Sequence, residues 1–213
     1  MKLRKYIKED SATICRWIKD EKSLYQWSAD RIGKFPLLDD DLNKDYEPVI
    51  SSDKFIPLTA IDEDDNVVGH LFIRYPNEAD NSTVRFGYVI VNPAIRGCGK
   101  GQEMLQLAIN YARDVLNACK ITLGVFRNND SARYCYEAVG FRSIEKTEIY
   151  KMTIGEWECV EMELQLDWQY VMLSLESLCF LEIFFILYVE KNVSGRINHG
   201  IRKNRRIIQA PFK

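Results

Sequence analysis

The chain of 213 residues is 46% hydrophobic and 28% charged, a balance that suits one globular domain with a buried core and excludes disorder throughout. Its net charge of −2 leaves no basic footprint, so nucleic acid is not an expected partner. Six scattered cysteines without a CxxC pair and only two histidines give zinc few ligands, so no metal site is expected. The start, MKLRKYIKED, lacks the apolar core of a signal peptide, and a cytoplasmic location is expected.

The first fifty residues predict one strand followed by helical and irregular segments. Residues 2–7 form a short apolar and basic run that predicts a strand. Residues 11–21 place apolar side chains at helical spacing after Ser11, which predicts one helix capped by that serine. Residues 28–50 contain a glycine and two prolines, and they predict a loop, a short helix and a second loop.

The middle of the chain predicts three strands and then an exit from the sheet. Residues 55–62 and 67–75 are apolar runs on either side of EDDN, a pattern typical of a hairpin. Residues 82–91 predict the third strand. Pro93 follows directly, and since proline cannot donate to a central ladder, the chain is expected to leave the sheet there.

The remainder predicts further alternation of helix and strand. Met104 to Val115 carry apolar residues at steps of three and four, which marks a helix with one buried face. Strands are then expected at residues 120–126, 141–152 and 156–164, with a helix at 129–139. The alternation predicts the α+β class.

Three glycines at every second position stand between the strand at 82–91 and the following helix. Gly97, Gly99 and Gly101 remove the Cβ atoms that would hold a ligand away, and they permit positive φ angles. A helix start also presents unpaired backbone N–H groups and the positive end of the helix dipole. With Arg96 at its mouth, this segment predicts a phosphate site.

Three other interpretations of this glycine-rich loop are a simple turn, a Rossmann fingerprint and a Walker A loop. The glycines can simply form a turn, which a lone glycine-rich loop does about as often as it binds an anion. A Rossmann fingerprint fits poorly, because the spacing is GxGxG and no acidic ribose ligand follows at the expected distance. A Walker A loop is excluded, because no GK[ST] closes it.

Two segments together resemble the GNAT family of N-acetyltransferases. RGCGKG, Arg96 to Gly101, looks like the family's pyrophosphate loop, Q/R-x-x-G-x-G/A. NNDSARYCYEAVGF, 128–141, looks like its N-x-x-A-x-x-x-Y-x-x-x-GF segment. The resemblance covers about residues 1–166 and is nearest to the branch of ribosomal-protein and small-amine acetyltransferases. It implies a mixed, mostly antiparallel central sheet flanked by helices.

The resemblance also implies acetyl-CoA as co-substrate and assigns its contacts. The strand that includes Val89, Ile90 and Val91 would bind the pantetheine arm through its backbone, and an N–H near Val89 would face the thioester oxygen. In the family this strand splays from the next one. The remaining implied cofactor residues are Arg96, Gly97, Cys98, Gly99, Lys100, Gly101, Gln102, Asn129 and Ala132.

Tyr136 is the catalytic residue that the resemblance implies, as the general acid that protonates the departing thiolate. The alternative for Tyr136 is an ordinary core tyrosine. Asn129 is expected to hold either the cofactor or the turn, and a helix cap is nearly as good an interpretation. Tyr134 is expected to pack or to lie beside the cofactor.

The general base and the acceptor are the least determined parts of the sequence. Some relatives use a glutamate on the strand before the loop, whereas here that strand carries Arg85 and Tyr88. A water chain or a carboxylate from another strand can serve instead. Trp27, Phe35 and the acids Asp39 to Asp41 are expected to lie near the amine, although solvated loop acids are an equal alternative.

Residues 167–213 form an atypical C-terminal extension that does not resemble the family. Within it, Tyr170 to Val189 is long enough to span a bilayer, but its two glutamates about balance its apolar residues in the free energy of insertion. A membrane anchor is therefore less expected than an added element packed on the domain or on another subunit.

The chain is thus expected to be an N-acetyltransferase for a primary amine, in a small molecule or at a protein N-terminus or lysine, by direct attack in a ternary complex. A monomer or homodimer is expected. The alternative is a non-catalytic module that binds acyl-CoA or a nucleotide.

Overall fold

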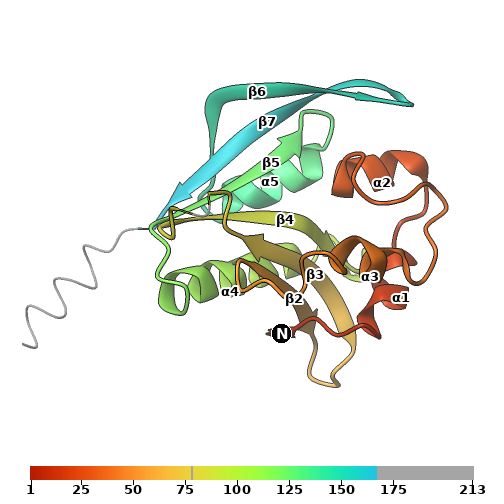
Figure 1. The fold of residues 1–213 in the computed structure, drawn as a ribbon, viewed down its shortest axis with the longest axis horizontal. Coiled ribbons are helices and arrows are strands. Elements are labelled where there is room, and N and C mark those ends of the chain that lie inside the picture. Colours follow the sequence, from red (N-terminus) through yellow and green to blue (C-terminus); the bar gives the residue numbers. More distant parts are fainter. Residues whose placement is uncertain (78, 167–213) are drawn as a thin grey trace, which may run out of the picture. The chain divides into compact units, whose positions relative to one another are not determined.

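Seven strands form one mixed sheet in the computed structural model, which describes residues 1–77 and 79–166. The strands lie in the order β1-β2-β3-β4-β5-β7-β6, and β4 with β5 is the parallel pair (Figure 1). The other neighbouring pairs are antiparallel. Their bounds are β1 Lys2–Lys5, β2 Phe55–Ile61, β3 Val67–Arg74, β4 Thr83–Val91, β5 Lys120–Phe126, β6 Arg142–Met152 and β7 Gly155–Gln165.

Helices cover both faces of this sheet and divide the core in two. One cluster packs the apolar stripe of α4, Lys100–Asp114, and part of α5, Asp130–Ala138, on the strands. The other packs α1, Asp10–Cys15, α2, Glu21–Ser28, and α3, Asp41–Tyr46, on the far face of β3 and β4. Figure 1 shows α1, α2 and α3 together on one side of the molecule.

The expected α+β class, with a mostly antiparallel sheet flanked by helices, is confirmed. The seven predicted strands and the helices after the glycines and at 129–139 are present with small shifts at their ends. The chain also leaves the sheet at Pro93, which begins a short 3-10 helix, η1, Pro93–Ile95.

The single helix expected at 11–21 is wrong, because the segment holds α1 and the start of α2. The amides of Trp17 and Ile18 bond to carbonyls three residues back, which tightens and ends α1. Asp20 then caps a new helix by accepting from Ser23 N at 2.6 Å. Ser11 is no cap, because α1 has no side-chain cap and Ser11 is buried inside it.

Met1–Leu166 form one structural unit. The predicted extension, 167–213, and the borderline span Tyr170 to Val189 lie outside the described residues. Among residues 1–77 and 79–166, no helix has both the length and the apolar character needed to cross a bilayer.

A buried carboxylate ties the N-terminus to the sheet. Asp10 is 2% exposed and accepts two hydrogen bonds of 2.7 Å from Arg4, one of 2.7 Å from Thr59 and one of 3.1 Å from Ile7 N. Burial by itself would raise the pKa of Asp10, but these hydrogen bonds outweigh burial and hold the pKa below its ordinary value.

We predict that Asp10→Asn lowers the free energy of unfolding by about 2–4 kcal/mol at pH 7, because it leaves the Arg4 guanidinium without its counter-charge. The pKa of Asp10 is lower in the folded protein than in the unfolded chain. Its contribution to the free energy of unfolding is therefore complete above about pH 4, the pKa in the unfolded chain, and is lost as the pH falls through the pKa in the folded protein. Urea unfolding from pH 7 to pH 2 measures both effects. Asp65→Asn, which removes the exposed ion pair of Lys2 on the same strand, is the control and should change little. A similar loss in both variants would contradict the assignment.

Candidate active site

The parallel strands β4 and β5 pair along only part of their length. Their register covers Thr83 to Arg85 on β4, opposite Lys120 to Thr122 on β5, and the described residues contain no further pair between them. Figure 1 shows the two strands diverging toward α2. Backbone groups of β4 from Phe86 onward therefore have no partner on β5, which gives the interior of the sheet an open edge.

A β-bulge on β4 sits where the strands have separated. His70 pairs with Ile90 and Phe72 with Gly87, so Leu71 alone faces both Tyr88 and Val89. Tyr88 has a φ of +49°, which is rare for a residue with a large side chain.

The bulge reverses which side chains of β4 face which core. Val84 and Phe86 join the α4 side, whereas Tyr88 and Ile90 join the α1–α3 side. One extra residue produces this reversal, because side chains alternate along a strand. The bulge also turns backbone groups of Tyr88 and Val89 out of the regular ladder.

Gly87 makes the bulge possible by leaving room for an aromatic ring. A Cβ built on Gly87 would lie 2.2 Å from Cζ of Phe72, so any side chain there would displace that ring. The sequence analysis missed this position. Its signal was a glycine inside an otherwise apolar strand, which often marks a bulge or a close approach.

A cavity of about 620 Å³ occupies the space between the separated strands. It is lined by β4, by the first turns of α4 and α5, and by Trp27 and Gln26 of α2. Eleven of the residues predicted to bind the cofactor or to act in catalysis line it together: Val89, Ile90, Val91, Arg96, Gly97, Gly99, Gly101, Gln102, Asn129, Ala132 and Tyr136.

Cys98 and Lys100 are the two predicted cofactor residues that do not line this cavity. Cys98 is exposed, and the Lys100 ammonium pairs with Glu103 at 2.8 Å within α4. Their assignment as cofactor contacts stays a prediction.

The glycine loop has the conformation that an anion site needs. Gly97 and Gly99 have φ angles of +78° and +74°, and no atom lies within 4 Å of a Cβ placed on either residue. Gly99 begins α4 without a side-chain cap, so the first amides of the helix have no side-chain acceptor at Gly99. Arg96 Nε donates to the carbonyl of Val91 at 3.2 Å and joins the loop to the end of β4.

Gly101 has a different role from Gly97 and Gly99, because it does not use the positive φ angle that a glycine permits. It lies inside α4, and its φ is not positive. A Cβ at this position would lie 3.0 Å from Sγ of Cys135, so its absence lets α5 approach α4 closely. Both helix starts thereby reach the same cavity.

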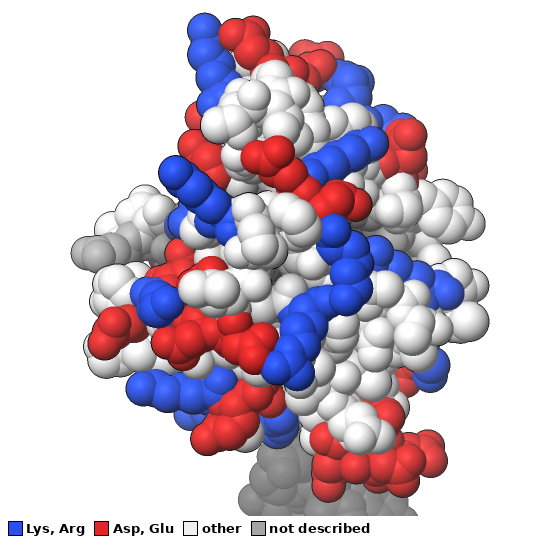
Figure 2. Space-filling view, turned by 90° about the vertical axis from the view of Figure 1, so that its right-hand side faces the viewer, with Lys and Arg blue, Asp and Glu red and all other residues white. Residues whose placement is uncertain are grey.

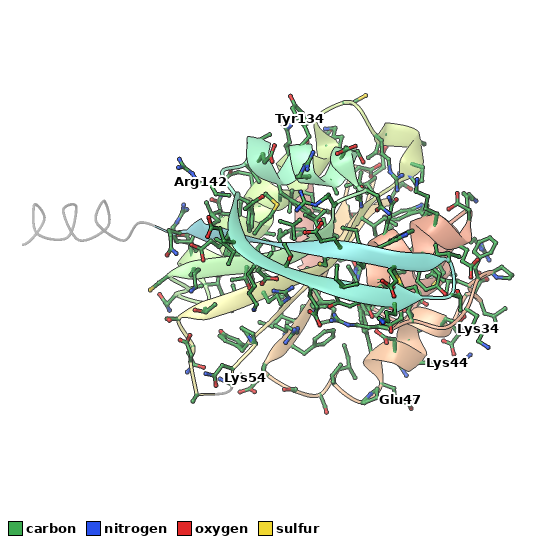
Figure 3. All side chains as sticks on the ribbon, turned by 90° about the horizontal axis from the view of Figure 1, so that it is seen from above. Lys34, Lys44, Glu47, Lys54, Tyr134 and Arg142 are labelled. Atoms are coloured by element: carbon green, nitrogen blue, oxygen red, sulfur yellow. The ribbon has the colours of Figure 1, made fainter. Side chains whose placement is uncertain are left out.

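Asn129 caps α5, which is the helix-cap role expected as an alternative to holding the cofactor or the turn. Its side chain accepts from Ala132 N at 3.4 Å and from the Ser131 hydroxyl at 3.3 Å. Asn129 also lines the cavity, so a contact with a cofactor stays a prediction. Tyr134 of α5 is 70% exposed and also lines the cavity, so its expected place beside the cofactor stays a prediction (Figure 3).

Tyr136 is buried on the inner side of α5, with its ring edge-on to Phe141 at 6.0 Å. Burial raises the pKa of Tyr136, and the neighbouring Cys135 adds to the rise. The hydroxyl therefore stays protonated at neutral pH. No described residue forms a hydrogen bond with it, and a donor lining a cavity without a protein partner is available to a ligand.

The acceptor is expected in residues 24–41, and of that stretch Gln26 and Trp27 line the cavity. The Trp27 ring lies 5.1 Å from that of Tyr88, and its buried Nε1 has no partner among the described residues. Phe35 and Asp39 to Asp41 lie outside the lining. Their carboxylates are engaged locally: Asp39 with Arg16, Asp40 with Asn43, and Asp41 with Lys44 and Leu38 N.

The structure brings an acid to β4 from another element, although β4 itself carries none. Asp45 of α3 lies near the Tyr88 hydroxyl, and each group affects the pKa of the other. Burial raises the pKa of Asp45, and the Tyr88 hydroxyl and the charge of Arg31 offset this only in part. No motif around Asp45 marks it as a site residue, because its place beside Tyr88 depends on contacts between distant segments.

The surface around the α1 and α2 side mixes both signs of charge. Lys and Arg side chains alternate with Asp and Glu over this face, as Figure 2 shows. Within residues 1–77 and 79–166, no group of three or more potential ligands could hold a metal ion.

Comparison with solved structures identifies close matches of fold. A spermidine N-acetyltransferase from Vibrio cholerae, solved with CoA and spermine, is 21% identical over 76% of this chain and 94% of its own, with a TM-score of 0.64. A spermidine/spermine N-acetyltransferase from the same organism, solved with manganese ions, is 21% identical over 81% of this chain and 95% of its own, with a TM-score of 0.60. At this identity the likeness shows a shared fold.

The match to a family model is independent of these structures. It spans residues 14–141, more than half of the chain, and includes the bulged strand, the glycine loop and both helices that start at the cavity. The chain therefore belongs to the acetyltransferase (GNAT) family.

Proposed function

We propose that this chain transfers the acetyl group of acetyl-CoA to a primary amine by direct attack in a ternary complex. The observation that carries the proposal is the open edge of β4 beside two helix N-termini in one cavity. An extended chain of amides can pair with such an edge, and its phosphates can meet the amides that start a helix. The comparisons give no support to the alternative of a non-catalytic binding module.

The pyrophosphate, the pantetheine arm and the thioester of acetyl-CoA each have a matching group in the cavity. The pyrophosphate would bind the amides of the loop at Gly97 and Gly99, with Arg96 beside them. The pantetheine arm would pair with the backbone of Val89 and Val91. The thioester would then lie near the bulge, where a backbone N–H near Val89 can stabilise the oxyanion.

The chemical step follows from this placement. The neutral amine attacks the thioester carbon, the C–N bond forms, and the tetrahedral intermediate loses the C–S bond. The thiolate takes a proton from the Tyr136 hydroxyl, and water returns a proton to the tyrosinate. The proton released by the amine passes to water or to Asp45, which lies near the Tyr88 hydroxyl. That route replaces the carboxylate that other relatives carry on this strand.

The acceptor enters from the α1–α3 side of the sheet, opposite α4. One solved relative was obtained with spermine, which supports an amine of small size. The cytoplasmic location, the monomer or homodimer, and the separation into 1–166 and 167–213 stay predictions.

We expect the full chain to release CoA from acetyl-CoA when it is supplied with primary amines and peptide N-termini in a screen. A thiol reagent follows CoA, and mass spectrometry detects the acetylated product. Release of CoA without any acetylated amine would show hydrolysis and would reject amine transfer.

Tyr136→Phe should lower kcat by about 10²-fold or more with the best amine of that screen, because the thiolate would leave without its proton donor. Acetyl-CoA affinity should stay within a factor of about two, since the ring that packs on Phe141 is kept. Steady-state kinetics and calorimetry separate the two quantities. An unchanged kcat would remove Tyr136 from the chemical step.

Gly99→Val should weaken acetyl-CoA binding by about 10²-fold, because a branched side chain at a φ of +74° strains the loop and stands before the helix amides. Gly155→Val is the matched control. Gly155 also has a positive φ, +127°, with open space around it, but it lies in the turn between β6 and β7. Calorimetry that finds equal affinity in the folded Gly99 variant and the control would refute the phosphate assignment.

A further inference from the structure

A row of charged side chains crosses the sheet on the face that carries α1, α2 and α3. Arg74 of β3 and Arg85 of β4 are register partners, so their side chains stand opposite each other on one face. On the far side of β5, Glu161 of β7 pairs in register with Gly124. The row begins where β4 and β5 start to separate.

Arg85 and Glu161 form an ion pair across β5. Both guanidinium Nη atoms donate to the carboxylate, the second at 3.0 Å, and the two side chains are 21% and 16% exposed. A Cβ on Gly124 would lie 2.9 Å from Arg85 Nη2, so the ion pair lies directly over this glycine. Gly124 lines the cavity, whereas Arg85 and Glu161 are not among the lining residues.

Arg74 has no such partner. Among the described residues, its guanidinium forms no hydrogen bond and no ion pair, although the side chain is half-buried. Burial lowers the pKa of Arg74, and the charges of Arg85 and Arg31 lower it further, with Glu161 acting in the opposite direction. Like charges directly opposite on neighbouring strands are destabilising, so this arrangement costs stability in the free protein.

The face around Arg74 carries charges of both signs. Arg85 and Arg31 act on Arg74 together with Glu161, and Glu148 and Glu161 act with Arg85 and Arg31 on the neighbouring Cys159. Glu161 is already bound by Arg85. Arg31 is exposed and Arg74 is partly exposed, so the cluster can be reached from solvent. A guanidinium without a partner matches a planar anion through two parallel hydrogen bonds.

We propose that Arg74 binds a carboxylate on the acceptor, so that the amine substrate is an amino acid or a short peptide with a free carboxylate. This inference rests on the proposed function. Arg85 lies three to four residues before the bulge, roughly 10–13 Å along the strand. The carboxylate is therefore several bonds away from the reacting amine. A polyamine, which brings only positive charge, is a poor acceptor for this surface.

The test compares acceptors that differ only in this group. Peptides and lysine are supplied as the free acid and as the carboxamide, with spermidine as the polycation, and kcat/KM is measured from CoA release. The wild-type chain should prefer each acid over its amide by about 10- to 100-fold, the range of a charge-assisted hydrogen-bonded pair.

Arg74→Gln should bring the acid and the amide to within about threefold while leaving kcat/KM for the amide unchanged, an outcome that general structural damage would not give. Arg74→Lys, which keeps the charge but not the planar fork, should retain part of the preference. Arg113→Gln removes a guanidinium from the far end of α4 and should retain all of it. Thermal unfolding checks that each variant is folded.

The outcomes separate this inference from the proposed function. Equal rates for acids and amides, or a preference for spermidine, overturn the carboxylate site while transfer itself stands. If no amine is acetylated, calorimetry measures the binding of each acid and each amide to the CoA-bound protein. Tighter binding of the acids that is lost in Arg74→Gln supports the carboxylate site, and equal binding of acids and amides overturns it.

Discussion

The separation of β4 from β5 after Arg85 is the constraint on which the whole site depends. Backbone amides in the middle of a sheet normally have partners on both sides, and leaving them unpaired costs free energy. The Phe72 ring lies against Gly87, and the bulge at Tyr88 and Val89 interrupts the ladder with β3. An extended ligand that pairs with β4 restores the missing hydrogen bonds.

The same separation brings the other parts together. Because α4 follows β4 and α5 follows β5, the starts of both helices reach the gap between those strands. Gly101 holds the helices close by making room for Cys135. On the opposite face, the gap begins at the Arg85–Glu161 pair, and Tyr88 and Trp27 line the cavity. Cofactor and acceptor can therefore approach one point from opposite faces of the sheet.

The sequence predicted the strands, α4, α5 and the glycine loop because each carries a local signal, such as apolar periodicity or glycine spacing. It failed at α1 and α2, where the capping pair Asp20 and Ser23 was overlooked inside an apparent longer helix. Asp45 and Arg74 could not be assigned to the site, since their positions depend on contacts between distant segments. The reversal of side chains at Tyr88 was also hidden, because a bulge depends on pairing with β3.

Amide hydrogen exchange on the full chain, with and without saturating CoA, tests the central claim most directly. If β4 provides the open edge that binds the cofactor, CoA should slow exchange in the segment 86–91 and in the first turn of α4, and should leave the β2–β3 hairpin unchanged. Bound CoA that leaves exchange in residues 86–91 unaltered would contradict the account.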